Sequence, residues 1–453
     1  MHKLKVFLFV LFPAICILVI ALWLKPQFTK YTPVVSCPGC NIVFVSFDDL
    51  GASRVHSYGY QRTTTPSIDF FAENGFKFTN AISVSSWTLP SSISWFTGVY
   101  PSKHKILNEY SFLASQEEVL STPENLNNIL LTLPQILKEN GYTTGGFTGG
   151  AALNGKFGFS KGFDKYFDEE DFGGFDITVP EALRWISENK DKKLFVFLHS
   201  YGIHGQHTPE NGYDRRFLDF NYEGPLTGSK EEQKKLREDA LLTGQISLSD
   251  KDVRFLSDLY DEKVQRADEA FGKFIEEYKK LGLFDKTIFI ITSDHGEELY
   301  EHGRIDHGHS LYDELIKVPL VIWVPSNSRG VVIKNQVRSI DIFPTILEIS
   351  EVPFSENLSG QLEGISLVPL AKGARLKLDA YPETDYRYSV FLRAIRTADN
   401  YKYILNIENG EEQFYDLSAD PLELKNLASK FPKKMRLLKE KLFNHIQIYK
   451  QQK

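Results

Sequence analysis

Three apolar segments of the chain each end on residues that can bind a metal ion or transfer a proton. NIVFVSF is followed by Asp48 and Asp49, LFVFLH ends on His199, and TIFIITS is followed by Asp294 and His295. Continuous apolar segments of this length predict buried strands of a parallel or mixed sheet. Because the carboxyl ends of parallel strands share one edge of such a sheet, these side chains are expected to meet there.

The chemistry expected at that edge is metal binding. Three carboxylates held close together raise one another's pKa unless a cation neutralises them. We therefore predict one divalent ion held by Asp48, Asp49, Asp294 and His295. Carboxylates alone would suit Ca²⁺ or Mg²⁺, whereas the imidazole favours Mn²⁺ or Zn²⁺. The alternative is that aspartates after a strand only form turns or cap helices.

A candidate nucleophile precedes a predicted helix. In SSWTLPSSISWFTG, Thr88 stands just before Pro90, and proline fits the first turn of a helix. A hydroxyl there would face unpaired backbone N–H groups and the positive end of the helix dipole, which suits a phosphate or sulfate oxyanion. A threonine hydroxyl needs a metal ion or a base to act as a nucleophile, and the predicted cation would supply this activation. The alternative is that Thr88 only caps the helix.

The composition excludes one class of partner. The chain has 453 residues, 42% of them hydrophobic and 25% charged, with a formal net charge of −7. This composition is ordinary for a folded globular protein. A nucleic-acid-binding protein normally carries a basic excess, so no nucleic-acid partner is expected.

The N-terminus differs from the rest of the chain. Residues 6–24 contain no charged or strongly polar side chain and follow His2, Lys3 and Lys5. As a helix this run would reach about 28 Å, close to the thickness of a hydrocarbon core. A cleaved signal peptide usually has a shorter apolar core, so residues 1–30 are predicted to be an uncleaved membrane anchor and linker. The preceding positive charges predict a catalytic domain outside the cytoplasm.

The remaining chain divides into two parts. Strand-like and helix-like segments alternate over residues 41–370, which predicts a sheet covered by helices on both faces. Helices are expected at residues 67–74, 131–140, 180–189 and 258–281, and residues 222–249 are expected to be a surface insertion or loop. From about residue 385 to 453, short strands joined by turns predict an antiparallel subdomain. Cys37 and Cys40 precede a strand, which favours a local disulfide over a redox site.

A set of longer motifs resembles one family. FVSFDDLG, WTLPSSISWFTGVYPSKH, SDHGEE, HGHSLYDELIKVPLVIW and QFYDLSADPLELKNL look like successive signatures of the sulfatase family, within the alkaline phosphatase superfamily. The resemblance runs from about residue 41 to 427. It implies an alkaline-phosphatase-like mixed central sheet flanked by helices, a small C-terminal antiparallel α+β subdomain, and a divalent metal at the four predicted ligands. His204 and His309 match positions where family members contact substrate.

Three departures from the family pattern affect the expected chemistry. Sulfatases carry a Cys or Ser that is oxidised to formylglycine, and Thr88 stands at that position. The arginine usual two residues after the motif's proline is replaced by Ser92, and the family's Gly-Lys-Trp-His stretch is absent. A threonine nucleophile beside an Asp-His metal pair looks more like the sites of the phosphotransferase branches of the superfamily, which form a phosphothreonine intermediate.

We therefore expect an ester hydrolase that acts on sulfate or phosphate esters through Thr88. The substrate would be a small-molecule, glycan or lipid ester. Two alternatives stay open: a phosphotransferase that modifies an envelope lipid or glycan, and a non-catalytic pseudoenzyme. A second metal at His302 and His307 is a further alternative.

Overall fold

The computed structural model of the protein describes residues 33–106, 130–208, 216–325, 327, 329–353, 355–386 and 390–450. The predicted anchor at residues 1–30 lies outside this part of the chain. Within it, no helix combines the length and the apolar character needed to cross a bilayer. Residues Val34–Lys453 form one compact unit.

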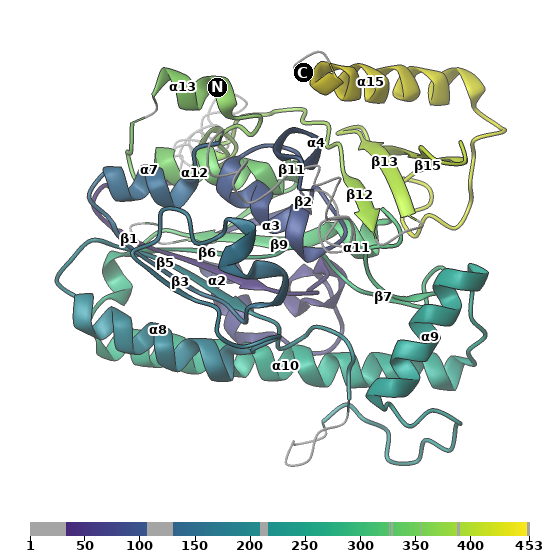
Figure 1. Ribbon diagram of the computed structural model, residues 1–453, viewed down its shortest axis with the longest axis horizontal. Helices are drawn as coiled ribbons and strands as arrows, with labels where there is room; N and C mark the ends of the chain where they lie inside the picture. Colours follow the sequence, from purple (N-terminus) through teal and green to yellow (C-terminus); the bar gives the residue numbers. More distant parts are fainter. Residues whose placement is uncertain are drawn as a thin grey trace, which may run out of the picture. The chain divides into compact units, whose positions relative to one another are not determined.

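A mixed sheet lies at the centre of this unit (Figure 1). Its strand order is β10-β2-β9-β6-β1-β5-β3-β4, with β11 paired to β2. The strand β9 runs antiparallel to both β2 and β6, and the other pairs are parallel. In sheet order the strands are β10 (Val331–Ile333), β2 (Phe76–Ile82), β9 (Lys317–Trp323), β6 (Thr287–Ser293), β1 (Asn41–Phe47), β5 (Leu194–Ser200), β3 (Thr143–Phe147) and β4 (Lys165–Phe167), with β11 at Val337–Arg338.

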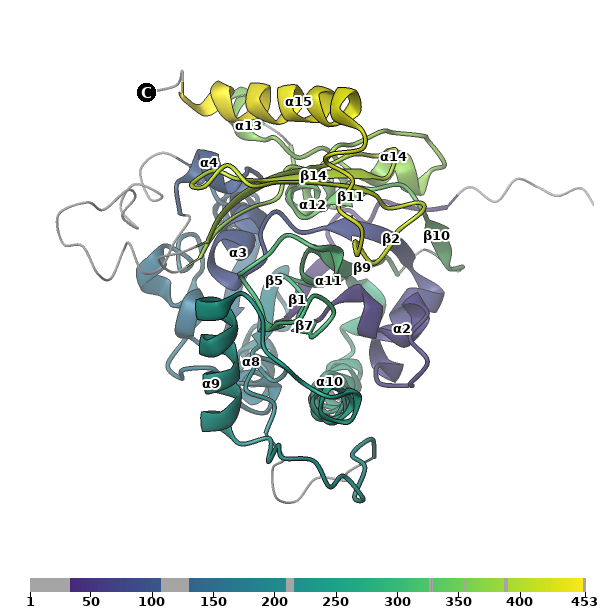
Figure 2. The same ribbon diagram turned by 90° about the vertical axis from the view of Figure 1, so that its right-hand side faces the viewer.

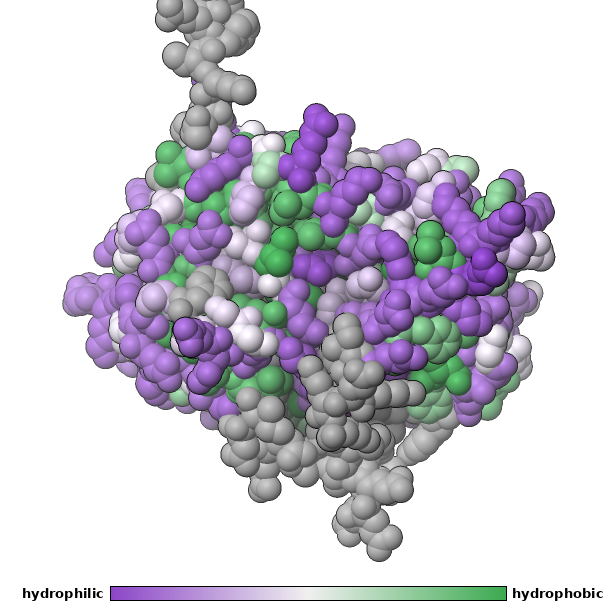
Figure 3. All heavy atoms as spheres, turned by 90° about the horizontal axis from the view of Figure 1, so that it is seen from above, coloured by the Kyte–Doolittle hydropathy of each residue, from purple (hydrophilic) through white to green (hydrophobic). Residues whose placement is uncertain are grey.

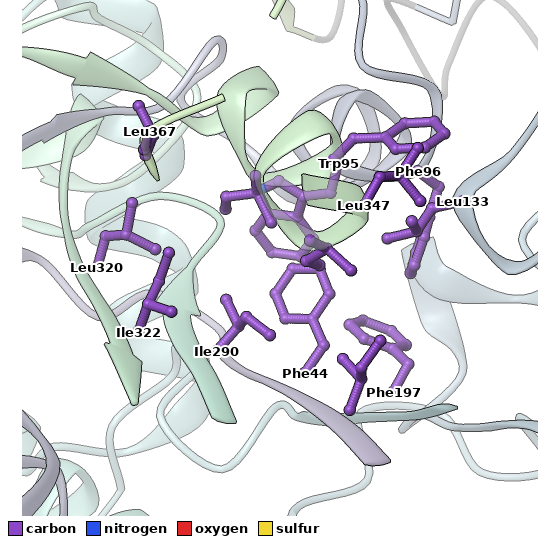
Figure 4. Close-up of a cluster of buried hydrophobic side chains, with 14 of the residues drawn as sticks. Phe44, Trp95, Phe96, Leu133, Phe197, Ile290, Leu320, Ile322, Leu347 and Leu367 are labelled. Atoms are coloured by element: carbon purple, nitrogen blue, oxygen red, sulfur yellow. The ribbon is translucent and has the colours of Figure 1, made fainter. Parts of the chain in front are cut away.

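The central strands are buried on both faces, as their continuous apolar sequences predicted. Every residue of β1, β5 and β6 is buried. Because side chains alternate along a strand, Phe44 faces one hydrophobic cluster and Val43 faces another. Figure 4 shows the first cluster, in which Phe44 and Phe197 of the sheet lie against Trp95. The sheet is therefore the rigid base on which the strand ends are positioned.

The predicted helices are present, with shifted ends. They are α2 (Pro66–Asn74), α7 (Leu133–Glu139), α8 (Phe175–Asn189) and α10 (Asp250–Lys280). Helix α10 begins eight residues before the predicted start, because Ser249 and Asp252 form a capping box. Helix α8 begins before Pro180, which lies inside the helix instead of in its first turn.

Other helices complete the two layers around the sheet. They are α3 (Thr88–Thr97), α4 (Pro101–His104), α9 (Lys230–Thr243), α11 (Asp313–Ile316), α12 (Ile342–Ile349), α13 (Glu356–Gln361) and α14 (Val368–Ala371). In Figure 1, α3, α7 and α12 lie on one face of the sheet, and α8 and α10 lie on the other. The polar stretch at residues 222–249 contains α9, most of whose side chains are not buried.

A second, antiparallel sheet follows, as the sequence predicted. Its strands are β12 (Glu383–Tyr386), β13 (Val390–Arg396), β14 (Tyr401–Asn406) and β15 (Glu412–Asp416), in that order. The C-terminal helix α15 (Pro432–Lys450) covers it (Figure 2), and Leu438 and Leu442 pack against Tyr403 and Phe414. The outer face near this helix mixes hydrophilic and hydrophobic side chains (Figure 3).

A buried ionic network joins the small sheet to the main domain. Asp313, at the start of α11, lies 2.8 Å from Arg396 Nη2 of β13 and 2.7 Å from Lys402 Nζ of β14. Lys402 also lies 2.8 Å from Glu423. Arg396, Lys402 and Glu423 are buried, so loss of the Asp313 carboxylate would leave the charge of Arg396 uncompensated.

The predicted local disulfide is also present. Cys37 and Cys40 are bonded to each other just before β1. The backbone N–H of Cys37 donates to the carbonyl of Ile349 at 2.8 Å, so the bonded loop contacts the end of α12.

Candidate active site

The three strand ends that carry the predicted functional residues lie side by side. Strand β1 is parallel to β5 and β6 and lies between them. Phe47 is in register with Ser293, and Ser46 with His199. Asp48 and Asp49 therefore follow β1 at the same edge where Asp294 and His295 follow β6, and all four side chains are buried. The convergence predicted from the sequence is confirmed.

Three of the four predicted ligands form one cluster. Asp48, Asp294 and His295 each offer a ligand atom within 4.8 Å of the others. Asp294 Oδ2 lies 3.4 Å and Asp48 Oδ1 3.9 Å from His295 Nε2. His295 Nδ1 lies 3.0 Å from the Gly296 carbonyl, so Nδ1 carries the proton and Nε2 presents its lone pair to the cluster.

This cluster has the properties of a cation site. Asp48 Oδ2 and Asp294 Oδ2 are buried and have no hydrogen-bond partner among the residues that the structure describes. Burial, together with the neighbouring carboxylates of Asp294 and Asp49, raises the pKa of Asp48 well above its ordinary value. Buried carboxylates in this state are stabilised by a cation. The residues present therefore fit a divalent metal ion.

Thr88 lies at this cluster. It is the first residue of α3, after the N-cap residue Trp87, and no side chain caps the helix. The Thr88 hydroxyl donates to Asp48 Oδ1 at 3.0 Å and lies 3.2 Å from His295 Nε2. The same hydroxyl thus borders both the carboxylate cluster and the N-terminus of α3, where anions bind favourably.

Asp49 lies on a different side of His295. Its Oδ1 atom is 2.9 Å from His295 Nδ1, the ring nitrogen that does not face Thr88. The same oxygen is 3.0 Å from His307 Nδ1. Burial alone would raise the pKa of Asp49, but His307 and His295 hold it well below its ordinary value. The structure thus places Asp49 with a second group of side chains, which includes His204 and His307.

The two histidines predicted to contact substrate are placed differently. His204 Nδ1 contacts the Gly205 carbonyl at 2.6 Å, and the ring centroid lies 5.2 Å from that of His307. Burial lowers the pKa of His204 to about 4, so the ring is neutral near pH 7. His309 Nε2 lies 2.7 Å from Glu298 Oε2 instead, and no described contact joins it to Thr88 or to the carboxylate cluster.

Further site residues lie in or next to a short hairpin after β6. Its strands are β7 (Glu298–Leu299) and β8 (Ile305–Asp306). His307 Nδ1 lies 3.1 Å from both Glu297 Oε2 and Asp306 Oδ1. The sequence paired His307 with His302, but His302 Nδ1 contacts Glu314 at 2.6 Å and belongs to a separate group. Two motifs of the sequence, SDHGEE and RIDHGHS, are rich in acidic residues and histidine, and they could have identified Glu297, Asp306 and His307 as site residues.

His199 is also part of this edge. It is fully buried at the end of β5, and within the described part of the chain neither ring nitrogen has a hydrogen-bond partner. Burial lowers its pKa to about 4, so its ring is neutral and offers both a donor and an acceptor.

Comparison with known proteins identifies the family. The mixed central sheet and the small C-terminal sheet form an alkaline-phosphatase-like fold. The family model described as Sulfatase matches residues 40–352, and the model described as N-sulphoglucosamine sulphohydrolase, C-terminal, matches residues 300–452. The chain belongs to the sulfatase family, whose members generally bind a divalent metal.

Among curated relatives, arylsulfatase K from Bos taurus is 31% identical over 43% of this chain and 37% of its own length. The match therefore spans little more than a third of that relative. The ulvan-active sulfatase of Formosa agariphila is 25% identical over 86% of this chain and 77% of its own length.

Solved structures confirm the predicted fold. A protein solved in complex with its substrate D-glucosamine-2-N,6-O-disulfate superposes with a TM-score of 0.69 and 21% identity, over 91% of this chain and 98% of that one. The phosphonate monoester hydrolase of Agrobacterium radiobacter superposes with a TM-score of 0.67 and 19% identity, over 90% and 96%. The mixed central sheet and the small C-terminal sheet are shared features of this fold.

Proposed function

We propose that the protein is a metal-dependent hydrolase of sulfate or phosphate esters in which Thr88 is the nucleophile. The observation that carries the proposal is the position of the Thr88 hydroxyl. It lies 3.0 Å from Asp48 Oδ1 and 3.2 Å from His295 Nε2, at the N-terminus of α3. One buried oxygen thus borders a cation-binding cluster and a set of backbone donors suited to an oxyanion.

The side chains around Thr88 have separable roles. Asp48, Asp294 and His295 would hold the metal ion, which would lower the pKa of the hydroxyl and offset the negative charge of the transferred group. Asp48 Oδ1 accepts a hydrogen bond from the Thr88 hydroxyl, and this bond keeps the hydroxyl oxygen turned towards the cluster. The first backbone N–H groups of α3 would donate to the anionic oxygens of the ester. Thr88 Oγ1 would form a bond to the phosphorus or sulfur atom as the bond to the alcohol oxygen breaks. Thr88 would lose its hydroxyl proton to solvent, and the departing alkoxide would take a proton from water. A second water molecule would then attack the same phosphorus or sulfur atom, free the threonine and release the phosphate or sulfate.

The residues at and near the nucleophile position support direct attack by the Thr88 hydroxyl over formylglycine chemistry. Thr88 and Ser92 stand where the family pattern has the oxidised residue and an arginine. Because residue 92 is a serine, this position carries no positive charge. The Ser92 hydroxyl is buried and has no hydrogen-bond partner among the described residues. A threonine ester intermediate needs no prior oxidation of the side chain.

The proposed substrate is an anionic ester of a small molecule or glycan. The printed names of the relatives and neighbours refer to aryl, ulvan and glucosamine sulfates and to phosphonate monoesters. For the chain's location we propose an N-terminal single-pass anchor with the catalytic domain outside the cytoplasm. The apolar run at residues 6–24 and the preceding lysines support it.

Turnover of model esters tests the proposal. The purified protein is stripped with a chelator, reconstituted with Mn²⁺, Zn²⁺ or Ca²⁺, and assayed with p-nitrophenyl sulfate, p-nitrophenyl phosphate and bis-p-nitrophenyl phosphate. We expect turnover of at least one ester that disappears with chelator and returns with metal. Absence of metal-dependent turnover across the panel would refute the hydrolase assignment and favour the pseudoenzyme.

A further inference from the structure

A cavity lies where the central sheet meets the small antiparallel sheet. Its volume is about 430 Å³, within the range of small-molecule sites. The main domain lines it with residues of β2 and β9, and the small sheet lines it with Arg396 of β13 and the segment after β15. Among the described residues of its lining there is neither Thr88 nor a predicted metal ligand. The cavity is therefore a candidate site separate from the carboxylate cluster.

The buried charges beside this cavity are not balanced. Asp313 accepts a hydrogen bond from Arg396 at 2.8 Å and lies 2.7 Å from Lys402, which also lies 2.8 Å from Glu423. A third cation, Lys317, is the first residue of β9 and lines the cavity. Its ammonium group has no hydrogen bond or ion pair within the described part of the chain. Three cations thus face two carboxylates.

The other carboxylates of the lining already have partners. Glu314 lies 2.6 Å from His302 Nδ1, and Glu301 lies 3.5 Å from Arg54 Nη2. A second lysine of the lining, Lys334, is exposed, and it has no ion pair among the residues that the structure describes. The charge left without a partner in this cavity is therefore positive, and its ligand should be an anion.

The position of Lys317 makes this unpaired charge costly. Its side chain is only partly exposed, and burial lowers its pKa, although Asp313 acts in the opposite direction. An anion bound beside the ammonium group would remove the cost of holding it away from water without a counter-charge. Because Glu301 and Glu314 also line the cavity, they would repel a second negative charge on the ligand. A single carboxylate therefore suits the cavity better than a doubly charged phosphate.

A hydrogen-bond acceptor is also left unused in the cavity. The register of β2 against β9 shifts between Phe78 and Ala81, at Thr79 and Asn80, and both of these residues line the cavity. Such irregularities re-aim side chains and are frequent next to binding sites. Asn80 Oδ1 is buried and has no hydrogen-bond partner among the described residues. A ligand hydroxyl would satisfy this oxygen.

We propose that this cavity binds a small organic acid with one carboxylate, one hydroxyl and an apolar body. The carboxylate would pair with Lys317 and Lys334, and the hydroxyl would donate to Asn80 Oδ1. The apolar body would pack against Leu417 and Leu422, which line the cavity from the segment after β15. The inference goes beyond the proposed function, because it does not depend on the chemistry at Thr88.

Calorimetric titration of the purified protein with matched probes tests this proposal. The probe 4-hydroxybenzoate combines the three features, 4-hydroxybenzamide has the same shape without the charge, and benzoate lacks the hydroxyl. We expect one equivalent of 4-hydroxybenzoate to bind. Its Kd should be at least about tenfold lower than that of the amide and about threefold lower than that of benzoate.

Substitution of the central lysine locates the site. Lys317→Met keeps the chain length, removes the charge, and should weaken binding of 4-hydroxybenzoate at least about tenfold. Lys165→Met is the matched control, because Lys165 is also a partly exposed strand lysine, lies in β4 at the far edge of the sheet, and does not line the cavity. It should leave the Kd unchanged.

Reductive methylation followed by peptide mass spectrometry gives a second readout on the unsubstituted chain. Bound 4-hydroxybenzoate should slow the methylation of Lys317 and not that of Lys165, whereas 4-hydroxybenzamide should slow neither. This measurement decides the matter if Lys317→Met does not fold.

Four results would overturn the proposal. They are absence of binding at concentrations up to about 10 mM, equal binding of the acid and the amide, binding that survives Lys317→Met, and inorganic phosphate bound more tightly than 4-hydroxybenzoate. None of them depends on ester turnover, so failure of the hydrolase assignment would leave this inference intact.

Discussion

Replacement of Thr88 by valine is the perturbation that best separates the possible roles of this residue. Valine has nearly the same shape and retains the buried methyl group, but it removes the hydroxyl. Both contacts of that oxygen would be lost: the 3.0 Å hydrogen bond to Asp48 and the 3.2 Å contact with His295. The three cluster ligands stay in place, so metal content should not change.

The size of the kinetic effect distinguishes a nucleophile from a positioning group. Removal of one preorganised hydrogen-bond donor lowers kcat by about 10²–10³-fold. Removal of a nucleophile costs far more, on the order of 10⁶-fold in a well-studied hydrolase. We therefore expect kcat/KM of Thr88→Val to fall by at least about 10⁴-fold, whereas Thr88→Ser, which keeps the oxygen, should stay within about tenfold of wild type.

Steady-state assays with the best ester of the panel measure this, with metal content checked in each sample. Thr97→Val is the matched control, because Thr97 lies in the same helix, is equally buried, and donates only to the Ile93 carbonyl at 2.9 Å. It should keep nearly wild-type kcat/KM. Retention of more than about 1% of wild-type activity by metal-loaded Thr88→Val would refute the nucleophile assignment.

Three other outcomes are expected. Asp313→Asn should lower the free energy of unfolding by about 3–5 kcal/mol, because it leaves the buried Arg396 without a carboxylate partner and Lys402 with Glu423 alone, while Asp399→Asn, in an exposed pair, should cost at most about 1 kcal/mol in the same urea titration. Burial would raise the pKa of Asp313, but Arg396 and Lys402 hold it well below its ordinary value, so this stabilisation is present above about pH 4 and is lost as the pH falls; an equally steep acid loss in the variant would contradict this. Chelation should lower the melting temperature measured by calorimetry, and metal in a thousandfold excess over its Kd should restore about 4 kcal/mol; an unchanged melting temperature would argue against a folded-state metal site. His309→Ala should lower stability, since it removes the ring that contacts the buried Glu298 Oε2 at 2.7 Å, and should reduce kcat/KM less than about tenfold; a loss comparable with that of Thr88→Val would restore His309 to the catalytic group.

The core of the fold was predictable because its strands carry a strong local signal. The segments of β1, β5 and β6 are continuously apolar, and each ends on polar residues. Helix starts were less predictable. Pro180 suggested a first turn, yet α8 begins at Phe175, and α10 begins at the Ser249 cap within a stretch whose polarity suggested a loop. The start of α10 is set by its capping box, and α8 buries Phe175 in its first turn, so neither start coincides with the predicted one.

The site was only partly predictable. The convergence of Asp48, Asp294 and His295 follows from strand order, and the position of Thr88 follows from the helix start. The side of the His295 ring on which Asp49 lies depends on a turn with positive φ, which residue spacing does not encode. His307 lies next to a hairpin of two-residue strands, too short to show a period that would have predicted its place.

The central claim is that the Thr88 oxygen forms the bond to the transferred group. Intact mass spectrometry of the metal-loaded protein, quenched in acid during turnover, tests it most directly, with peptide mapping to locate any adduct. The proposed mechanism predicts a phosphoryl or sulfuryl group on Thr88 that disappears once the substrate is exhausted. Steady turnover with an unmodified Thr88, or an adduct on another residue, would contradict it.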